Sequence, residues 1–287
     1  MKRSASLCAV FLLVATGSSL AGRAGVPHNR SGPKPMAVAA AAPSRGYFKT
    51  APSRNCVNKA ETSCRRRNAF PRAARTCASS INHSSWEPRP DNSTANHTVG
   101  DGSYSWGPAA TNRYWAAWAK RVRLVQGKFT GTTTEMFSWA ACRWGIDENL
   151  LRAVAVTESY WHQSNWGDSC GGGDATIGSF GVMQIKNKGC DGSRVWGGMP
   201  DIRRSTALSV DFYTARLRAC YNGDFYDGGA WLYRGQTVRQ IAAAHGWPYV
   251  LWGCVGSWFS GGWYDAGAVT YLQKVKAALA HRTWRGF

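Results

Sequence analysis

Glu158 is the residue whose setting most clearly suggests chemistry, because it follows an apolar run near the end of a predicted helix. Leu151, Val154 and Ala155 precede it by seven, four and three residues, and these offsets share one helical face. We therefore expect the carboxyl group to point toward the core. Burial disfavours a charged carboxylate and raises its pKa, so this group can act as a general acid at neutral pH. A buried glutamate paired with an arginine or with backbone donors is the plainer alternative.

Two predicted helices and a glycine-rich segment would position this carboxyl group. Thr132 and Glu135 form a predicted capping box at the start of the first helix, and Gly145 suits a left-handed stop at its end. Asp147 is the predicted N-cap of the next helix, which runs to about residue 160. The glycine-rich segment over 174–188 predicts a tight hairpin or an irregular strand pair.

The rest of the C-terminal part is also predicted to be mainly helical. Apolar residues at helical spacing begin near residue 109, and Ser205 begins an amphipathic helix that ends near Gly223. A short helix is expected over 237–244, and Asp265 is the predicted cap of a final helix. We assign no helix to the aromatic and glycine-rich stretch 252–263. The result is a mainly α domain over 106–287 with one small β element.

The first hundred residues differ in composition from the rest. They carry fifteen Lys or Arg and three Asp or Glu, whereas fourteen of the fifteen Trp residues of the chain follow residue 100. Residues 22–105 are expected to form a basic, low-complexity arm and linker, since they bury too little apolar surface to offset the entropy of ordering. The formal net charge of +19 favours anionic partners such as nucleic acid, anionic lipid or an anionic cell-wall polymer, without choosing among them.

The N-terminus has the layout of a secretory signal. Lys2 and Arg3 precede an apolar run over 7–15, and small residues lie around Ala21. We expect residues 1–21 to be a signal peptide and the protein to be secreted, extracellular or associated with the cell wall. The apolar run is too short to span a bilayer, which takes about 20 apolar residues, and no later stretch is long enough, so no transmembrane segment is expected.

The motifs around Glu158 resemble those of a known superfamily. Glu158-Ser159-x-Trp161, followed by Gly181-Val182-Met183-Gln184, is similar to the Glu-Ser and Gly-Leu-Met-Gln motifs of the soluble lytic transglycosylases and goose-type lysozymes. Residues 140–153 resemble the helices that lead to the catalytic glutamate in that family. Residues 258–261 stand where the family has Tyr-Asn-Ala-Gly, and 268–275 look like its closing helix. The resemblance covers about residues 132–280.

This resemblance implies a lysozyme-like helical fold that cuts the β-1,4 bond between N-acetylmuramic acid and N-acetylglucosamine in peptidoglycan glycan strands. Glu158 would take the position of the catalytic acid, and no cofactor or metal is implied. Aromatic side chains suit a saccharide cleft because sugar rings stack on them, and Trp166 and Trp263 also flank the motifs. The expected substrate-binding residues are Ser159, Trp161, Gly181, Met183, Gln184, Trp258, Ser260 and Tyr271.

Two features leave alternatives open. Trp258-Phe259 replaces the Tyr-Asn pair of the family, which keeps the aromatic platform but loses the amide that would hydrogen-bond a sugar. Either the substrate is held differently, or a nearby group such as Gln184 or Ser260 takes the place of that amide. A hydrolase usually needs a second carboxylate, and the candidates are Asp168, Asp174 and Asp191, although a role in forming turns is the simpler interpretation for each. We favour a lytic transglycosylase, in which Glu158 acts first as acid and then as base and a 1,6-anhydro product forms.

Other functions compete with this hypothesis. The first is a goose-type lysozyme hydrolase. The second is a non-catalytic protein that binds the cell wall, with the basic arm contacting its anionic polymers. A secreted nucleic-acid binder is compatible with Arg65-Arg66-Arg67, but no recognised nucleic-acid motif accompanies this run, so no specific nucleic-acid partner is expected.

Eight cysteines follow the predicted signal peptide, and an even number in an exported chain favours disulfides. Zinc is disfavoured because no Cys-x-x-Cys pair is present. Cys170–Cys190 and Cys220–Cys254 are the expected pairs, since each brackets a loop next to the predicted cleft. Four cysteines remain. Those of the arm, Cys56, Cys64 and Cys77, are expected to form disulfides with one another and with Cys142.

Overall fold

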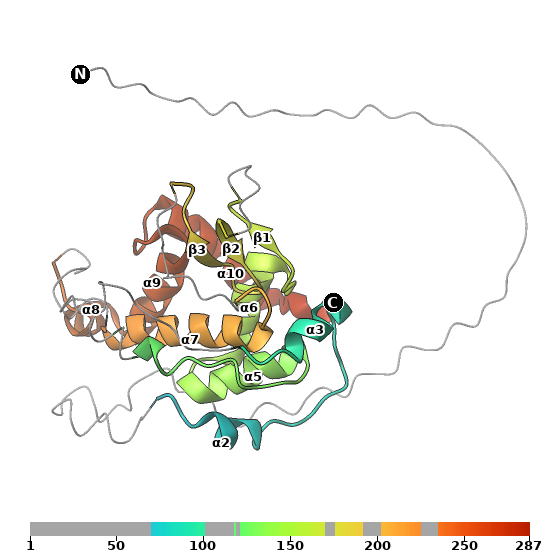
Figure 1. Cartoon of the computed structure of the whole chain (residues 1–287). Helices are drawn as coiled ribbons and strands as arrows, with labels where there is room; N and C mark the ends of the chain where they lie inside the picture. Colours follow the sequence, from blue (N-terminus) through green and yellow to red (C-terminus); the bar gives the residue numbers. More distant parts are fainter. Residues whose placement is uncertain (1–69, 101–117, 119–120, 170–175, 192–201, 225–234) are drawn as a thin grey trace, which may run out of the picture. The chain divides into compact units, whose positions relative to one another are not determined.

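A computed structural model of the chain describes residues 70–100, 118, 121–169, 176–191, 202–224 and 235–287 (Figure 1). These residues all belong to one compact unit, Ser44–Phe287. The unit is mainly helical and carries a small three-stranded antiparallel sheet, which confirms the predicted mainly α class. The described helical elements are α2 (Ala74–Ala78), η2 (Pro90–Asn92), α3 (Ser93–Asn96), α5 (Thr133–Trp144), α6 (Glu148–Ser159), α7 (Thr206–Asn222), α8 (Val238–His245), α9 (Trp247–Ser260), α10 (Ala266–His281) and η4 (Thr283–Gly286).

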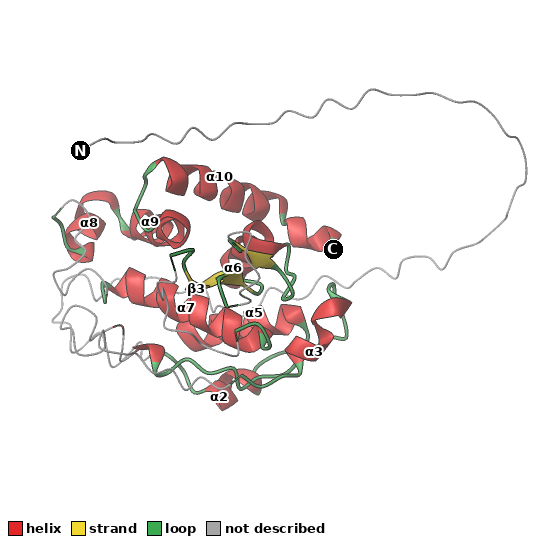
Figure 2. Ribbon diagram, turned by 45° about the horizontal axis from the view of Figure 1, so that its top comes forward, coloured by secondary structure: helices red, strands yellow, loops and turns green. Residues whose placement is uncertain are grey.

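Helix α6 lies at the centre of the packing. It packs against α5 on one side and α10 on the other, while α7 covers α5 and α9 lies against α10. Figure 2 shows the same order, with α9 and α10 on one side of α6 and with α5 and α7 on the other. Helix α7 is buried along nearly its whole length because it lies between α5 and α9. This arrangement places the last turn of α6 beside α10.

The helix caps explain why the central helices begin and end where they do. The side chain of Thr132 accepts a bond from the backbone N–H of Glu135, and the Glu135 carboxylate accepts one from the N–H of Thr132. Asp147 caps α6 by accepting the backbone N–H groups of the second and third residues after it. Gly145 adopts the left-handed conformation with φ 61°. The predicted capping box, N-cap and stop are all confirmed.

The sheet has the order β1 (Trp166–Gly167), β2 (Gly178–Phe180) and β3 (Ile185–Lys188), and both pairings are antiparallel. Strands β2 and β3 form the strand pair predicted in the glycine-rich segment, and their register shifts between Gly178 and Ser179. Strand β1 was not predicted, because two residues are too few to show an alternating pattern.

The aromatic stretch 252–263 differs from the prediction, since most of it belongs to helix α9. Its glycines suggested a loop, but here they allow close packing. A Cβ atom on Gly253 would lie 2.5 Å from the Trp263 ring, and one on Gly256 would lie 3.0 Å from the Ala268 Cβ atom. Glycine at these positions therefore lets α9 approach α10 and the loop between them.

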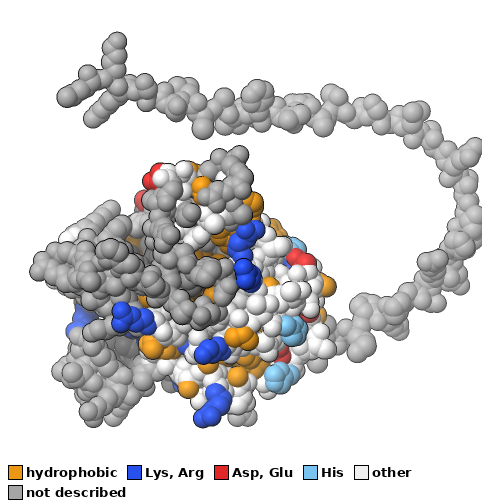
Figure 3. Space-filling view, viewed as in Figure 1, with side chains coloured by type: hydrophobic (Ala, Val, Ile, Leu, Met, Phe, Trp, Pro, Cys, Tyr) orange, Lys and Arg blue, Asp and Glu red, His pale blue; other side chains and the backbone are white. Residues whose placement is uncertain are grey.

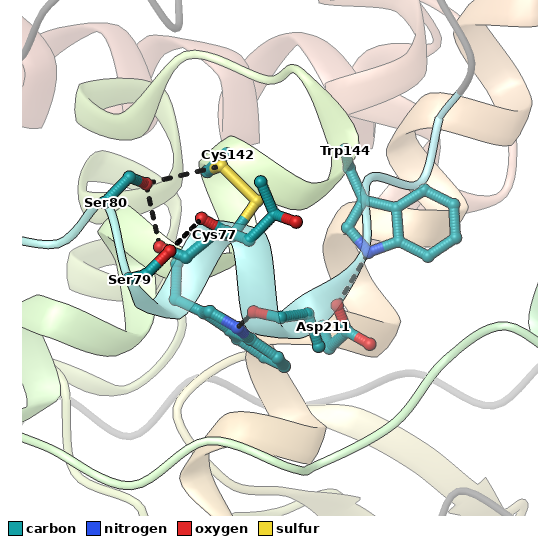
Figure 4. Close-up of a disulfide and its surroundings, with 9 residues drawn as sticks. Cys77, Ser79, Ser80, Cys142, Trp144 and Asp211 are labelled. Carbon is teal, nitrogen blue, oxygen red and sulfur yellow. Dashed lines mark hydrogen bonds between the residues drawn. A yellow bond between two sulfur atoms is a disulfide. The ribbon is translucent and has the colours of Figure 1, made fainter.

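Residues 70–100 differ from the flexible arm and linker expected there, because they are packed against the helical unit. Cys77 of α2 is fully buried and forms a disulfide with Cys142 of α5 (Figure 4). The Glu87 carboxylate accepts the backbone N–H of Thr133 at 2.6 Å, and the Asn92 amide donates to the Trp161 carbonyl at 2.7 Å. A composition rich in Ser and Asn does not show that these residues will make buried polar contacts, so this packing could not be predicted from it.

The cysteine predictions can be compared with the structure at several positions. The expected Cys220–Cys254 disulfide is present and joins α7 to α9. Cys77–Cys142 agrees with the expectation that the arm is tied to Cys142. Cys190 is disulfide-bonded, whereas Cys170, its expected partner, lies outside the described residues together with Cys56, Cys64 and the predicted signal peptide.

On the face shown in Figure 3, charged side chains are spread out. In the view of Figure 3, Lys and Arg side chains lie scattered among uncharged ones and do not gather in one patch. Within the described ranges, no helix has both the length and the apolar character that crossing a membrane requires.

Candidate functional site

A cavity of about 320 Å³ lies where the end of α6, the sheet, α9 and α10 meet. Glu158 and Thr157 come from α6, and the sheet region contributes both a carboxylate and a lysine. Helix α9 supplies two aromatic side chains, and α10 supplies a tyrosine and a second lysine. The lining residues are Thr157, Glu158, Asp168, Ser179, Gln184, Lys186, Trp258, Phe259, Thr270, Tyr271 and Lys274.

Glu158 stands in the last turn of α6, and the residue as a whole is half-buried. The Tyr271 hydroxyl of α10 donates a hydrogen bond to the Oε1 atom of Glu158. Burial raises the pKa of Glu158 to about 8, and the negative charge of Asp168 adds to this, while hydrogen bonds from Tyr271 and Trp258 oppose it. At neutral pH the group therefore holds its proton and can donate it.

The turn between β2 and β3 is fixed to α6 by Ser159. Its hydroxyl donates to the Val182 carbonyl at 2.9 Å, which places the turn next to Glu158. Gly181 has φ +80°, and a Cβ atom there would lie 2.8 Å from the Gln163 side chain. The glycine-containing motif is thus explained by backbone conformation and close packing, and Gln184 follows it into the cavity.

Aromatic side chains form one wall of the cavity. Phe259 is 63% exposed, and its ring stacks on that of Tyr271 with centroids 5.3 Å apart and an interplanar angle of 7°. The half-buried Trp258 lies edge-on to Tyr213 at 4.9 Å. Exposed aromatic surface beside a protonated carboxyl group suits a ligand with an apolar face and a basic oxygen.

Polar side chains line the cavity on the side of the sheet. The Asp168 side chain is 60% exposed, and its Oδ2 atom lies 3.4 Å from the Lys186 Nζ atom. The Ser179 hydroxyl donates to the same oxygen at 3.1 Å. Asp168 was one of three candidate second carboxylates. Asp191 does not line the cavity, and Asp174 lies outside the described residues.

The structure brings four of the nine predicted site residues into the cavity lining, namely Glu158, Gln184, Trp258 and Tyr271. Met183 and Trp161 are fully buried in the core instead, and the Trp161 indole donates to the Arg152 carbonyl at 3.0 Å. Ser159 and Gly181 shape the turn instead. The Ser159 hydroxyl bonds to the turn's backbone, and Gly181 provides the backbone conformation that the turn needs. The Ser260 hydroxyl lies outside the lining and donates to the Gly262 carbonyl.

Several lining residues were missed or given another role. Phe259 was not among the predicted substrate-binding residues, although the Trp258-Phe259 pair was expected to keep an aromatic platform, and it supplies exposed aromatic surface to the cavity. Lys186 and Lys274 had no signal of their own, because a lysine on a strand or a helix usually faces solvent. Trp166 and Trp263, which flank the motifs, do not line the cavity, and Trp263 is buried against α9.

A second cavity of about 400 Å³ is larger, but the carboxylates that line it are engaged in hydrogen bonds that stabilise the fold. Glu87 accepts bonds from Asn96 and from the backbone of Thr133, and Glu135 is part of the α5 capping box. We therefore place the functional site in the smaller cavity, where a carboxyl group has a strongly raised pKa. Among the described residues, no group of three or more His, Cys, Asp or Glu side chains is arranged to hold a metal ion.

The cavity combines one carboxyl group held protonated, a tyrosine that orients it, an aromatic wall and a rim with charges of both signs. Such a set can protonate an oxygen of a bound ligand and then accept a proton back. Compared with models of protein families, with curated proteins and with solved structures, the chain matches none.

Proposed function

We propose that the protein is a peptidoglycan-cleaving lytic transglycosylase with a lysozyme-like fold, and that Glu158 is its general acid and base. The observation that carries this proposal is the Glu158 carboxyl group, whose pKa is raised to about 8 in a cavity walled by Trp258, Phe259 and Tyr271. The motif resemblance around Glu158 and Gln184 supplies the substrate, which is the β-1,4 bond between N-acetylmuramic acid and N-acetylglucosamine.

The reaction uses Glu158 twice. Its proton passes to the glycosidic oxygen, the bond from that oxygen to C1 of the muramic acid breaks, and the N-acetylglucosamine end leaves as an alcohol. The acetamido group of the substrate stabilises the positive charge that forms at C1. The Glu158 carboxylate then takes the proton of the muramic acid 6-hydroxyl, whose oxygen bonds to C1 and closes the 1,6-anhydro ring. Glu158 ends protonated, ready for another cycle.

Other lining residues have roles in this reaction. Tyr271 fixes the orientation of the Glu158 carboxyl group through its hydrogen bond. Phe259 and Trp258 provide the surface on which sugar rings stack. Gln184 supplies the amide that Phe259 lacks, since it lines the cavity and Ser260 does not.

The Glu158→Gln variant tests the assignment of the general acid. It keeps the shape of the side chain and removes the proton donor, so release of soluble fragments from purified peptidoglycan should fall by about 10²- to 10⁴-fold. Asp91→Asn, which neutralises a surface carboxylate outside the cavity, should keep activity. Undiminished activity of Glu158→Gln would overturn the proposal, and equal melting temperatures would show that both variants fold.

A goose-type hydrolase is the second candidate, because Asp168 lines the same cavity as Glu158. A carboxylate that activates water sits about 6.5–9.5 Å from the acid, and one that acts as a nucleophile sits about 5–5.5 Å away. Mass spectrometry of the products separates the mechanisms, since 1,6-anhydro ends mark a transglycosylase and reducing ends mark a hydrolase. Asp168→Asn should stop a hydrolase and leave a transglycosylase active.

A further inference from the structure

The two lysines of the cavity are unequally paired. Lys186 of β3 lies 3.4 Å from the Asp168 carboxylate. Lys274 of α10, three residues after Tyr271, lines the same cavity and forms no ion pair with the residues that the structure describes. Lys274 is an exposed residue of this lining, and its long, flexible side chain allows the ammonium group to reach a ligand bound in the cavity.

The charges of the lining do not cancel near neutral pH. Glu158 is uncharged there because burial holds its proton, and Asp168 and Lys186 balance each other. Lys274 remains as one uncompensated positive charge beside the aromatic wall. A neutral saccharide leaves this charge without a partner, whereas a saccharide with an acidic substituent can pair with it.

We propose that Lys274 binds a carboxylate substituent of the saccharide and makes the site selective for acidic over neutral glycans. The inference rests on the proposed function and narrows its substrate class. In a muramic acid residue the carboxylate would be that of the 3-O-lactyl group, free when no peptide is attached. The ion pair is accessible to solvent, so its contribution is modest and depends on salt.

A matched pair of ligands tests this selectivity. One is a tetrasaccharide of alternating N-acetylglucosamine and N-acetylmuramic acid with free lactyl carboxylates, and the other is the same compound with these groups converted to neutral methylamides. Binding is measured by isothermal titration calorimetry at low salt in the full chain carrying Glu158→Gln, which prevents turnover. We expect the free acid to bind about 3- to 5-fold more tightly than the amide, the upper range for an exposed ion pair.

The lysine is then replaced in that same background. Lys274→Met should reduce the preference to about 1-fold by weakening binding of the acid alone. Lys276→Met is the matched control, because it removes the same charge from the same helix at a residue outside the cavity, close to the Trp252 ring. This control should keep the full preference.

Each other outcome overturns the inference in a recognisable way. Equal binding of the two ligands, or a preference that Lys274→Met leaves unchanged, overturns the role of Lys274 and leaves the proposed function standing. If Lys276→Met also abolishes the preference for the acidic ligand, the preference arises from the overall electrostatic field of the protein, and the specific role of Lys274 is overturned. If neither tetrasaccharide binds, the saccharide site and the proposed function fail together with the inference.

Discussion

Glu158 and Tyr271 come from two helices separated by more than a hundred residues, and they meet at one hydrogen bond. That bond favours the ionised carboxylate, while burial in the cavity disfavours it, and burial has the larger effect. As a result, Glu158 is protonated at neutral pH, but its pKa of about 8 still allows it to lose the proton at moderately alkaline pH. The site is thus set for donation of a proton across the physiological range.

The pH dependence of activity follows from this balance. Because Glu158 must be protonated to donate, the rate should fall above pH 8 by about tenfold per pH unit. Tyr271→Phe removes the donor that favours the ionised form, so it should raise the pKa of Glu158 further and move this limb to higher pH. Fragment release measured between pH 5 and pH 10 checks both effects. A limb near the ordinary pKa of a glutamate would contradict the assignment.

Stability should depend on pH through the same residue. The native state keeps the Glu158 proton up to about pH 8, whereas the unfolded chain releases it near pH 4.5. Between these values the unfolded state binds fewer protons, so the free energy of unfolding should decrease as pH rises, by at most about 1.4 kcal/mol per pH unit. Below pH 4.5 this contribution is constant.

Chemical denaturation at pH 5, 6.5 and 8 measures this dependence. Subtracting the free energy of unfolding of Glu158→Gln from that of the wild type isolates the contribution of the carboxyl group. The difference should become less favourable to the wild type at each step. A constant difference would show that Glu158 has the same pKa in the folded and unfolded states.

At the scale of elements, two disulfides differ in their distance from the site. Cys220–Cys254 ties α7 to α9, the helix that carries Trp258, whereas Cys77–Cys142 ties α2 to α5 on the far side of α6. Their sequence separations are 34 and 65 residues. Chain-entropy arguments give each a stabilisation of about 4 kcal/mol.

Removing each disulfide in turn should distinguish an effect on stability from an effect on substrate binding. The Cys220→Ser/Cys254→Ser and Cys77→Ser/Cys142→Ser variants should both lose stability, and only the former should also raise KM by loosening the aromatic wall. Thermal denaturation and steady-state kinetics below the melting temperature measure the two effects. Equal KM values in both variants would show that α9 keeps its position without the bond.

How far the sequence predicts these elements depends on how local their signals are. Caps such as Thr132 with Glu135 and Asp147 were predicted because side chain and backbone partner lie within three residues. Helix α9 was missed because Gly253 and Gly256 resemble loop residues, and only the neighbouring Trp263 and Ala268 explain them. The meeting of Glu158 with Tyr271 was not predictable from spacing, and it entered through the motif resemblance alone.

At the scale of the whole molecule, residues 70–100 are part of the folded unit. Arg89 donates to the Tyr160 carbonyl at 2.7 Å, and its guanidinium lies 3.9 Å from the centre of the Phe287 ring. The C-terminal Phe287 ring also packs edge-on against Trp161 at 5.3 Å. This upstream segment and the C-terminus therefore both cover the end of α6, next to the turn that carries Glu158.

Truncation tests the contribution of the upstream segment. A chain of residues 70–287 should keep cooperative unfolding, whereas one of residues 101–287 loses the Cys77–Cys142 disulfide and the buried contacts of Asn92 and Glu87. Its melting temperature should be lower by more than 10 °C, since the disulfide alone contributes about 4 kcal/mol. Equal melting temperatures would mean that residues 70–100 cover the unit without stabilising it.

The burial of Asn92 and Asn96 has a consequence for producing the protein. Both begin an Asn-x-Thr triplet, as Asn82 begins an Asn-x-Ser triplet, and a eukaryotic host attaches glycans to such sites. Asn82 is exposed and can carry a glycan, but Asn92 and Asn96 are at most 1% exposed and their amides are bonded inside the fold. A sugar added at either residue would prevent closure of the upstream segment, so expression in a host without N-glycosylation, or with Thr94 and Thr98 replaced, should give the higher yield of folded protein.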